Sequence, residues 1–159
     1  CTGTVTVQDT SAPQVSVSPV MQLWPPNHTM RSFHLSDCAS AADNCAGSVD
    51  IDAQGTIISI YSDEPEDANG NGDGHTLGDI VVTGNSSFSI RSERQGQGNG
   101  RVYGVNFVVT DGSGNPRTAT CRFAVPHDQS CSSPVDDGAG SGYTVTVASS
   151  PDAVTPHRP

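Results

Sequence analysis

Short runs in which apolar and polar side chains alternate constrain the fold of this chain more than any other feature. The runs recur between turns rich in Gly, Pro, Asn and Asp, and no stretch of ten or more residues carries a helical stripe. Val occurs 17 times and Thr 14 times, against 3 Leu, a bias that favours a pleated sheet. We therefore predict an all-β fold, an antiparallel β-sandwich with almost no helix. The expected strands cover residues 4–8, 14–18, 32–36, 49–52, 56–61, 79–83, 87–91, 102–110, 118–125 and 143–148.

One hairpin is expected to hold the core. It joins strands 102–110 and 118–125 through residues 111–116, where Asp, Gly, Asn and Pro suit a tight turn and end strand pairing. Each of the two strands places its apolar residues on one face. These residues are Tyr103, Val105, Phe107 and Val109 in the first strand and Ala119, Cys121, Phe123 and Val125 in the second.

A length of 159 residues fits one domain. We expect the sandwich at residues 13–126, preceded at 1–12 by a terminal strand and linker that is exchanged or belongs to a preceding module. An extended arm at 127–159, with a strand at 143–148, is expected to follow. The two ends carry the same motif, Thr4-Val5-Thr6-Val7 and Thr144-Val145-Thr146-Val147. Either both strands belong to this sandwich, or one of them completes the sheet of another subunit by strand exchange.

Charge and hydropathy argue against two classes of partner. The chain has 7 Arg, no Lys and 17 acidic residues, so its net charge of -10 opposes nucleic-acid binding. No run approaches the ~20 apolar residues that span a bilayer, so we expect no membrane insertion. No basic segment followed by an apolar one opens the chain, and we expect a soluble protein whose export signal has been removed.

Five cysteines in a chain rich in Gly, Ser and Thr are typical of an oxidising compartment, which predicts an extracellular or cell-surface location. Sequence alone leaves the disulfide pairing open. Proximity favours a Cys38–Cys45 disulfide, because closing so short a loop needs little chain entropy. A Cys121–Cys131 disulfide would then leave Cys1 for another chain or module.

Oxygen ligands are concentrated between residues 63 and 79. Asp and Asn side chains recur at every second position from residue 67, with Gly at the sixth, as in the first half of an EF-hand-type calcium loop. The twelfth position is Gly78 in place of a bidentate Glu, so Glu64 or Asp79 would have to complete the shell. We predict bound Ca²⁺, and the alternative is a solvated acidic turn without an ion. The candidate ligands are Glu64, Asp67, Asn69, Asn71, Asp73 and Asp79.

The motifs of familiar catalytic and zinc sites do not occur in the sequence. There is no Gly-x-Ser-x-Gly, no His-Glu-x-x-His and no Cys-x-x-Cys. The acidic residues lie among glycines, whereas a catalytic acid of raised pKa needs an apolar pocket. We predict that the protein is not an enzyme and holds no zinc.

Six motifs occur in order within residues 10–130. They are Leu23-Trp24-Pro25-Pro26-Asn27-His28, Asp43-Asn44-Cys45, Ser62-Asp63-Glu64-Pro65, Asn71-Gly72-Asp73-Gly74, Gly98-Asn99-Gly100-Arg101-Val102-Tyr103 and Val125-Pro126-His127-Asp128-Gln129. Together they resemble bacterial secreted immunoglobulin-like modules related to hyalin repeats. The resemblance implies an immunoglobulin-like β-sandwich with long Gly-rich loops, found in large extracellular proteins with roles in adhesion or scaffolding.

These expectations combine into a non-catalytic structural or adhesive subunit outside the cell. It would be stabilised by calcium, would form homo-oligomers or tandem modules, and would polymerise head-to-tail into filaments by sharing a terminal β-strand. The alternative is a carbohydrate-binding module of a secreted enzyme or surface protein, in which exposed Trp24, Tyr61 or Tyr103 would stack on glycans.

Overall fold

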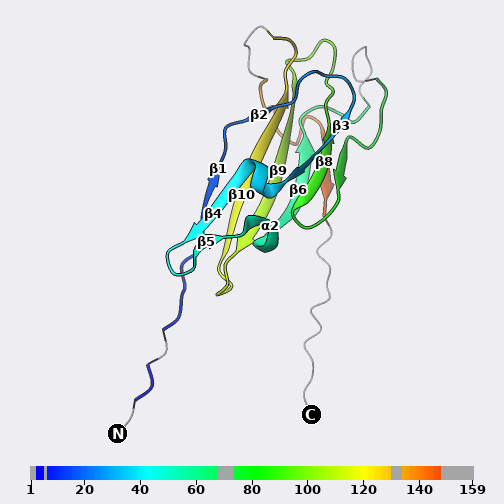
Figure 1. Cartoon of the computed structure of the whole chain (residues 1–159). Coiled ribbons are helices and arrows are strands. Elements are labelled where there is room, and N and C mark those ends of the chain that lie inside the picture. Colours follow the sequence, from blue (N-terminus) through cyan, green and yellow to red (C-terminus); the bar gives the residue numbers. More distant parts are fainter. Residues whose placement is uncertain (1–2, 6, 68–73, 130–133, 148–159) are drawn as a thin grey trace, which may run out of the picture.

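Most of the regular structure consists of β-strands, and the sheets pack against one another as a sandwich (Figure 1). The computed structural model describes residues 3–5, 7–67, 74–129 and 134–147. Within these residues, three sheets and two short helices enclose one hydrophobic core. The prediction of an all-β sandwich is therefore confirmed at the level of its packed sheets.

The largest sheet has five strands in the order β11-β6-β9-β10-β2. The predicted core hairpin lies at its centre, where β9 and β10 pair antiparallel from Pro116 opposite Thr110 to Val125 opposite Arg101. Pairing is antiparallel throughout except between β10 and β2. The strands are β2 (Met21–Gln22), β6 (Gly55–Ser62), β9 (Arg101–Thr110), β10 (Pro116–Val125) and β11 (Tyr143–Thr146).

A second sheet, in the order β3-β8-β7, covers part of this hairpin. Its strands are β3 (Met30–His34), β7 (Ile80–Val82) and β8 (Ser87–Arg91). Phe33 of β3 and Phe88 of β8 pack on Phe123 of β10, with ring centroids 4.7 and 5.5 Å apart. This aromatic cluster joins the two sheets.

The third sheet has the order β1-β4-β5, formed by β1 (Gln14–Val17), β4 (Ala39–Asp43) and β5 (Gly47–Val49). Strand β4 was not expected, because Ala-Ser-Ala-Ala-Asp lacks the β-branched residues that mark the other strands. Its alternation is nonetheless clear in the fold, since Ala39, Ala41 and Asp43 are buried while the residues between them are exposed.

Two single-turn helices replace the ends of predicted strands. They are α1 (Leu35–Cys38) and α2 (Ile51–Gln54). Helix α2 begins after Asp50, whose carboxylate accepts hydrogen bonds from the N–H groups of Asp52 and Ala53, and this N-cap competes with extended pairing. Neither helix, each four residues long, could cross a membrane, and no other helix occurs in the described residues.

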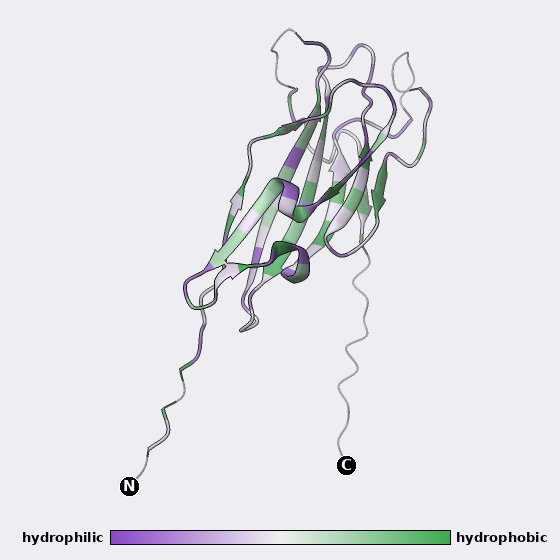
Figure 2. Ribbon diagram, viewed as in Figure 1, coloured by the Kyte–Doolittle hydropathy of each residue, from purple (hydrophilic) through white to green (hydrophobic). Residues whose placement is uncertain are grey.

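The core follows the alternation of the long strands. Tyr103, Val105, Phe107 and Val109 of β9 are fully buried, as predicted for one face of the hairpin. Figure 2 shows hydrophobic residues concentrated in the strands, whereas the loops that close the end opposite α2 are largely hydrophilic. Hydrophilic residues are therefore concentrated at that loop end.

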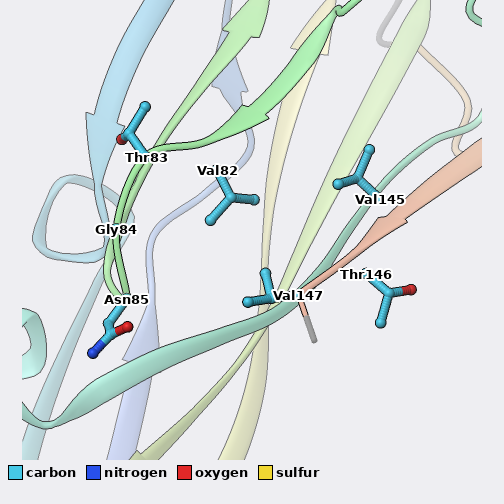
Figure 3. Close-up of a pocket in the computed structure, with 7 residues that line it drawn as sticks. All are labelled: Val82, Thr83, Gly84, Asn85, Val145, Thr146 and Val147. Carbon is cyan, nitrogen blue, oxygen red and sulfur yellow. The ribbon is translucent and has the colours of Figure 1, made fainter. Parts of the chain in front are cut away.

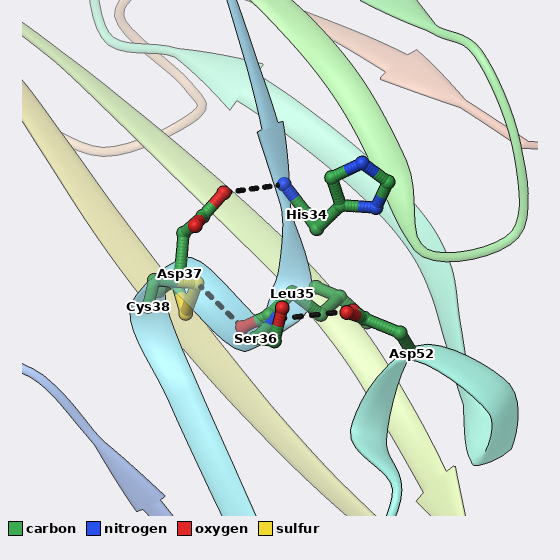
Figure 4. Close-up of a disulfide and its surroundings, with 7 residues drawn as sticks. His34, Leu35, Ser36, Asp37, Cys38 and Asp52 are labelled. Carbon is green, nitrogen blue, oxygen red and sulfur yellow. Dashed lines mark hydrogen bonds between the residues drawn. A yellow bond between two sulfur atoms is a disulfide. The ribbon is translucent and has the colours of Figure 1, made fainter.

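A disulfide joins Cys38, at the end of α1, to Cys121 of β10 (Figure 4). The Cα atoms are 6.0 Å apart and the two residues are 83 positions apart in the sequence. The predicted Cys38–Cys45 and Cys121–Cys131 pairings are wrong. Strand β4 separates Cys38 from Cys45, and five extended residues span about 16 Å, well beyond the ~7 Å limit for a disulfide. The bond is typical of a compartment outside the cytoplasm.

Of the two terminal motifs, the C-terminal one pairs within its own chain. Strand β11 lies antiparallel to β6, with Thr144 opposite Tyr61 and Thr146 opposite Ser59. The N-terminal motif was predicted to form a strand over 4–8, but no strand occurs in its described residues. Val5 and Val7 are 88% and 93% exposed, so the side chains of these two residues are almost free of contacts within the chain.

Replacing Cys38 and Cys121 together with Ala should lower the free energy of unfolding by about 4.5 kcal/mol, because the bond closes a loop of roughly 83 residues in the unfolded chain. Urea denaturation followed by circular dichroism measures the loss. Cys45→Ala, which removes an exposed free cysteine, should leave the midpoint nearly unchanged in metal-free buffer. Equal midpoints for the double variant and the parent would contradict this role of the bond.

Candidate functional site: a buried ion cluster at the loop end

Four strands bring charged side chains to the same end of the sandwich. Arg101 is the first residue of β9, and Glu64 follows the antiparallel neighbour β6 by two residues. In the other layer, Asp79 directly precedes β7 and Glu93 follows β8 by two residues. Antiparallel neighbours run in opposite directions, so the end of one strand lies beside the start of the next. These charged groups, which come from distant parts of the sequence, therefore meet at one end of the sandwich.

Arg101 is the centre of this cluster, and its side chain is fully buried. Its Nε donates to Glu64 Oε2 at 3.1 Å, and its NH1 donates to Asp79 Oδ2 at 2.8 Å and to Glu93 Oε1 at 3.5 Å. NH2 donates to the carbonyl oxygen of Pro65 at 3.1 Å. All three nitrogens of the guanidinium therefore have acceptors, as a buried charge requires.

A second arginine extends the network towards the surface. Arg91 Nε donates to Asp79 Oδ1 at 2.9 Å, so Asp79 is shared between two guanidinium groups. The hydroxyl of Tyr103 accepts from Arg101 NH1 at 3.1 Å and donates to the carbonyl oxygen of Arg91 at 2.9 Å. Burial opposes the charge of Arg101, but Tyr103, Asp79 and Glu64 raise its pKa overall, and it stays charged.

The second oxygen of Glu93, Oε2, has partners outside the arginine contacts. Thr76 Oγ1 donates to Glu93 Oε2 at 2.6 Å, and His28 Nδ1 lies 3.0 Å from the same oxygen. Burial raises the pKa of Glu93 and the nearby Asp79 raises it further, while the bonds from Thr76 and His28 lower it. The pKa of Glu93 is therefore raised overall.

Asp63 is a further buried acid beside this cluster. Its Oδ1 accepts from the N–H of Val102 at 2.7 Å and its Oδ2 from that of Asp137 at 3.3 Å. Burial raises the pKa of Asp63 to about 6, against the effect of these two bonds, and the negative charge of Glu64 adds to the increase. Three buried carboxyl groups, Glu64, Asp79 and Glu93, thus share two guanidinium groups, whereas Asp63 is bonded to backbone N–H groups alone.

The predicted calcium ligands divide into three groups. Glu64 and Asp79 are buried and bonded to Arg101, and Glu64 Oε1 has no hydrogen-bond partner in the described residues. Asp67 is half exposed, and its Oδ1 lies 2.9 Å from His75 Nδ1. Asn69, Asn71 and Asp73 lie outside the described residues. The calcium site itself stays a prediction, and two of its six candidate ligands are hydrogen-bonded to Arg101.

The ends of the predicted calcium loop are joined by hydrogen bonds. The N–H of Gly78 donates to Glu66 Oε1 at 2.7 Å, next to the contact between Asp67 and His75. Gly74 and Gly78 adopt positive φ angles of 70° and 74°, which glycine allows without strain. Residues 66 and 78 are therefore held together whatever the intervening segment binds.

A groove of about 350 Å³ runs between the open edges of the two layers (Figure 3). The turn from β7 to β8 lines one side and the end of β11 lines the other. Val145 and Val147 turn towards Val82 across the groove, and Thr146 turns away. Among the strand-exchange candidates, Val145, Thr146 and Val147 thus border this groove of mixed polar and apolar lining, and Thr144 pairs with Tyr61 of β6. Thr4, Val5 and Val7 belong to the unpaired arm, and Thr6 lies outside the described residues.

The three aromatic residues proposed for sugar stacking do not form an exposed platform. Tyr103 is fully buried, and Tyr61 is buried against Gly104, where a Cβ would overlap its ring. The hydroxyl of Tyr61 donates to Asp136 Oδ2 at 2.8 Å. Only Trp24, which is 38% exposed, remains accessible, so the contact surface needed by the carbohydrate-binding alternative is reduced to one ring.

The sequence contained a signal for Arg101 that went unused. Arg101 lies on the same inward face of β9 as Tyr103 and Val105, and a charged residue in such an alternation must have buried partners. The predicted strand 102–110 begins one residue after Arg101 and so leaves it out.

Comparisons of the chain with protein-family models, with curated proteins and with solved structures give no match.

Replacing Arg101 with Met should lower the free energy of unfolding by about 3–5 kcal/mol at pH 7, because the buried carboxylates lose their partner. The loss should shrink as pH falls. Without the guanidinium, the folded-state pKa values of these acids lie above their unfolded values, so protonation favours the folded state. Chemical denaturation at pH 7 and pH 5 measures both effects.

Arg122→Met is the matched control for this substitution. Arg122 Nε also pairs with a carboxylate, Asp136 Oδ2 at 2.8 Å, but its side chain is 47% exposed, so the loss should stay below about 1 kcal/mol. Similar losses for the two variants would show that burial of the Arg101 cluster has no special weight.

Proposed function

We propose that this chain is a non-catalytic structural module of an extracellular protein, built on an immunoglobulin-like sandwich and joined to neighbouring copies through its N-terminal arm. The observation that carries this proposal is the arm itself, where Val5 and Val7 are almost fully exposed at alternate positions of an unpaired, extended segment. Such a segment has the pattern of a strand that lacks its sheet.

The open edge of β11 supplies a matching acceptor. Val145 and Val147 have the same spacing as Val5 and Val7, and both pack towards the core. An arm added beside β11 would extend the five-stranded sheet and cover the groove with its own valines. Because donor and acceptor lie on different surfaces of one chain, the contact is head-to-tail and gives open filaments unless it closes into a ring.

The buried ion cluster supports a structural role over a catalytic one. A general acid or base must reach a substrate, whereas Glu64, Asp79 and Arg101 are buried and bonded to one another. The groove of Figure 3 is lined by Val, Thr, Gly and Asn and contains none of these charged groups. The cluster instead fixes the loops that surround it.

We expect the double variant Val5→Asp/Val7→Asp to abolish self-association, because it places charge where an apolar face must be buried. Light scattering coupled to size-exclusion chromatography measures the assembly. Thr4→Asp/Gln8→Asp is the matched control, since it adds the same charge to the opposite face of the arm and should leave assembly largely intact. A parent that stays monomeric at every concentration would overturn strand sharing.

A variant of the acceptor edge tests the same contact from the other side. The N–H of Val147 donates to Ile58 of β6, so strand alternation directs the N–H of Thr146 to the open edge. Thr146→Pro should therefore block strand addition while keeping the β6 ladder. Assembly of this variant at the parent's level would exclude β11 as the acceptor edge.

We also propose that Ca²⁺ binds the loop at residues 66–78, with Asp67, Asn69, Asn71 and Asp73 as side-chain ligands. The hydrogen bond from the N–H of Gly78 to Glu66 supports this assignment, because it closes the loop and reduces the conformational entropy that ion binding must overcome. Glu64 and Asp79, which are committed to Arg101, would anchor the loop ends and stay off the ion.

Calcium should raise the unfolding temperature of the purified chain, with a gain of about 2.7 kcal/mol at 100 times the dissociation constant. Differential scanning calorimetry in CaCl₂ and in EGTA measures the shift. Asp73→Asn should reduce it, and Asp128→Asn, outside the loop, should not. Identical melting in both buffers would remove calcium from the proposal without affecting strand sharing.

A further inference from the structure

A second group of ligand-type side chains lies at the other end of the sandwich. In the described part of the chain, Asp9, Asp43 and Cys45 form the one group of three or more acids, histidines or cysteines with the spacing of metal ligands. One ligand atom from each residue lies within 4.8 Å of the other two. None of the three belongs to the ion cluster around Arg101.

Two separate segments bring these residues together. Asp43 ends β4, and its Oδ1 accepts from the N–H groups of Cys45 at 2.8 Å and Ala46 at 2.9 Å, which fixes the turn into β5. Asp9 comes from the N-terminal arm. The side chain of Asn115, in the β9–β10 turn, donates to the carbonyl oxygen of Asp9 at 3.4 Å and holds the arm beside the turn.

The second carboxylate oxygen of Asp43 is the strongest sign of a ligand at this group. Asp43 is only 7% exposed, and its Oδ2 is buried without a hydrogen-bond partner. A buried carboxylate oxygen in this state carries a desolvation penalty that nothing in the described residues offsets. The ion pairs found there likewise include none with Asp9 or Asp43, although each of the acids around Arg101 except Asp63 has a basic partner.

Cys45 adds a soft ligand to this acidic setting. It is a free, exposed cysteine, whereas Cys38 and Cys121 are joined to each other.

We propose that Asp9, Asp43 and Cys45 bind a divalent metal ion of the zinc type, which clamps the N-terminal arm to the body of the sandwich. Zn²⁺ accepts thiolate and carboxylate ligands together, whereas Ca²⁺ and Mg²⁺ prefer oxygen alone. Three protein ligands leave a fourth, tetrahedral position for water. The site is distinct from the calcium loop in both place and chemistry.

The clamp acts on the segment that carries Val5 and Val7. Asp9 lies two residues beyond Val7, so a metal held by Asp9 and the β4–β5 turn would set the direction in which residues 3–8 leave the domain. Without the metal, the contacts that hold Asp9 include the 3.4 Å bond from the side chain of Asn115 to its carbonyl oxygen. The clamp does not depend on strand sharing, because it fixes the arm whatever the arm then contacts.

The experiment titrates the full oxidised chain with ZnCl₂ and, in parallel, with CoCl₂ in the presence of excess Ca²⁺. We expect one equivalent to bind and Co²⁺ to produce a thiolate charge-transfer band in the near ultraviolet. Asp43→Asn keeps an oxygen for the N–H groups of Cys45 and Ala46, so it should fold normally while weakening affinity at least about 10-fold. Cys45→Ser should lose the band, and Asp128→Asn should match the parent.

Two results would overturn the site. One is equal Zn²⁺ affinity for the parent, Asp43→Asn and Cys45→Ser. The other is peptide mass spectrometry that finds Cys45 in a disulfide with Cys1 or Cys131, whereas the proposal expects a free thiol that Zn²⁺ protects from alkylation. The clamp has its own readout in the ¹⁵N relaxation of Val5 and Val7. Zn²⁺ should slow their motion in the parent only, and unchanged motion in the zinc-loaded parent would exclude the clamp.

Discussion

The end of the sandwich that carries the long loops depends on one buried guanidinium group. Arg101 has no exposed surface, so every charge and hydrogen bond it needs must come from the protein. Glu64, Pro65, Asp79 and Glu93 supply them, which ties the segments after β6, before β7 and after β8 to the start of β9. The cost of removing these charges from water offsets much of the attraction between them. The cluster therefore acts mainly by fixing the geometry of the surrounding loops.

The sequence predicted the fold where side-chain alternation is the dominant constraint. Strand β8 covers the predicted residues, and β9 and β10 differ from their predictions by one and two residues at one end. The prediction failed where other forces act. Ala-rich β4 has little intrinsic preference for a strand and forms through pairing with β1 and β5, while the N-cap at Asp50 turned part of a predicted strand into α2. The Cys38–Cys121 bond escaped prediction because it reflects the packing of two layers, which sequence proximity does not report.

The candidate sites show the same limit. The oxygen ligands of residues 63–79 predicted a calcium site, but nothing in their spacing revealed that Arg101, 37 positions from Glu64, bonds to two of the six candidate ligands. Arg101 itself was visible in principle, as a charged residue on the inward face of β9. The group of Asp9, Asp43 and Cys45 was not, because it forms only when β4, its turn and the arm meet, and no zinc motif marks it.

The buried acidic residues at the two ends of the domain differ in how their negative charge is balanced. A chain with a net charge of -10 cannot neutralise all of its acids internally, and the buried ones are the most costly to leave unpaired. Arg91 and Arg101 both lie at the loop end, where they pair with Asp79, Glu64 and Glu93. In the described residues, no ion pair reaches Asp43 at the opposite end. The proposed metal would supply positive charge there, and because a thiol lies beside the carboxylates, the ligand set favours a metal softer than calcium.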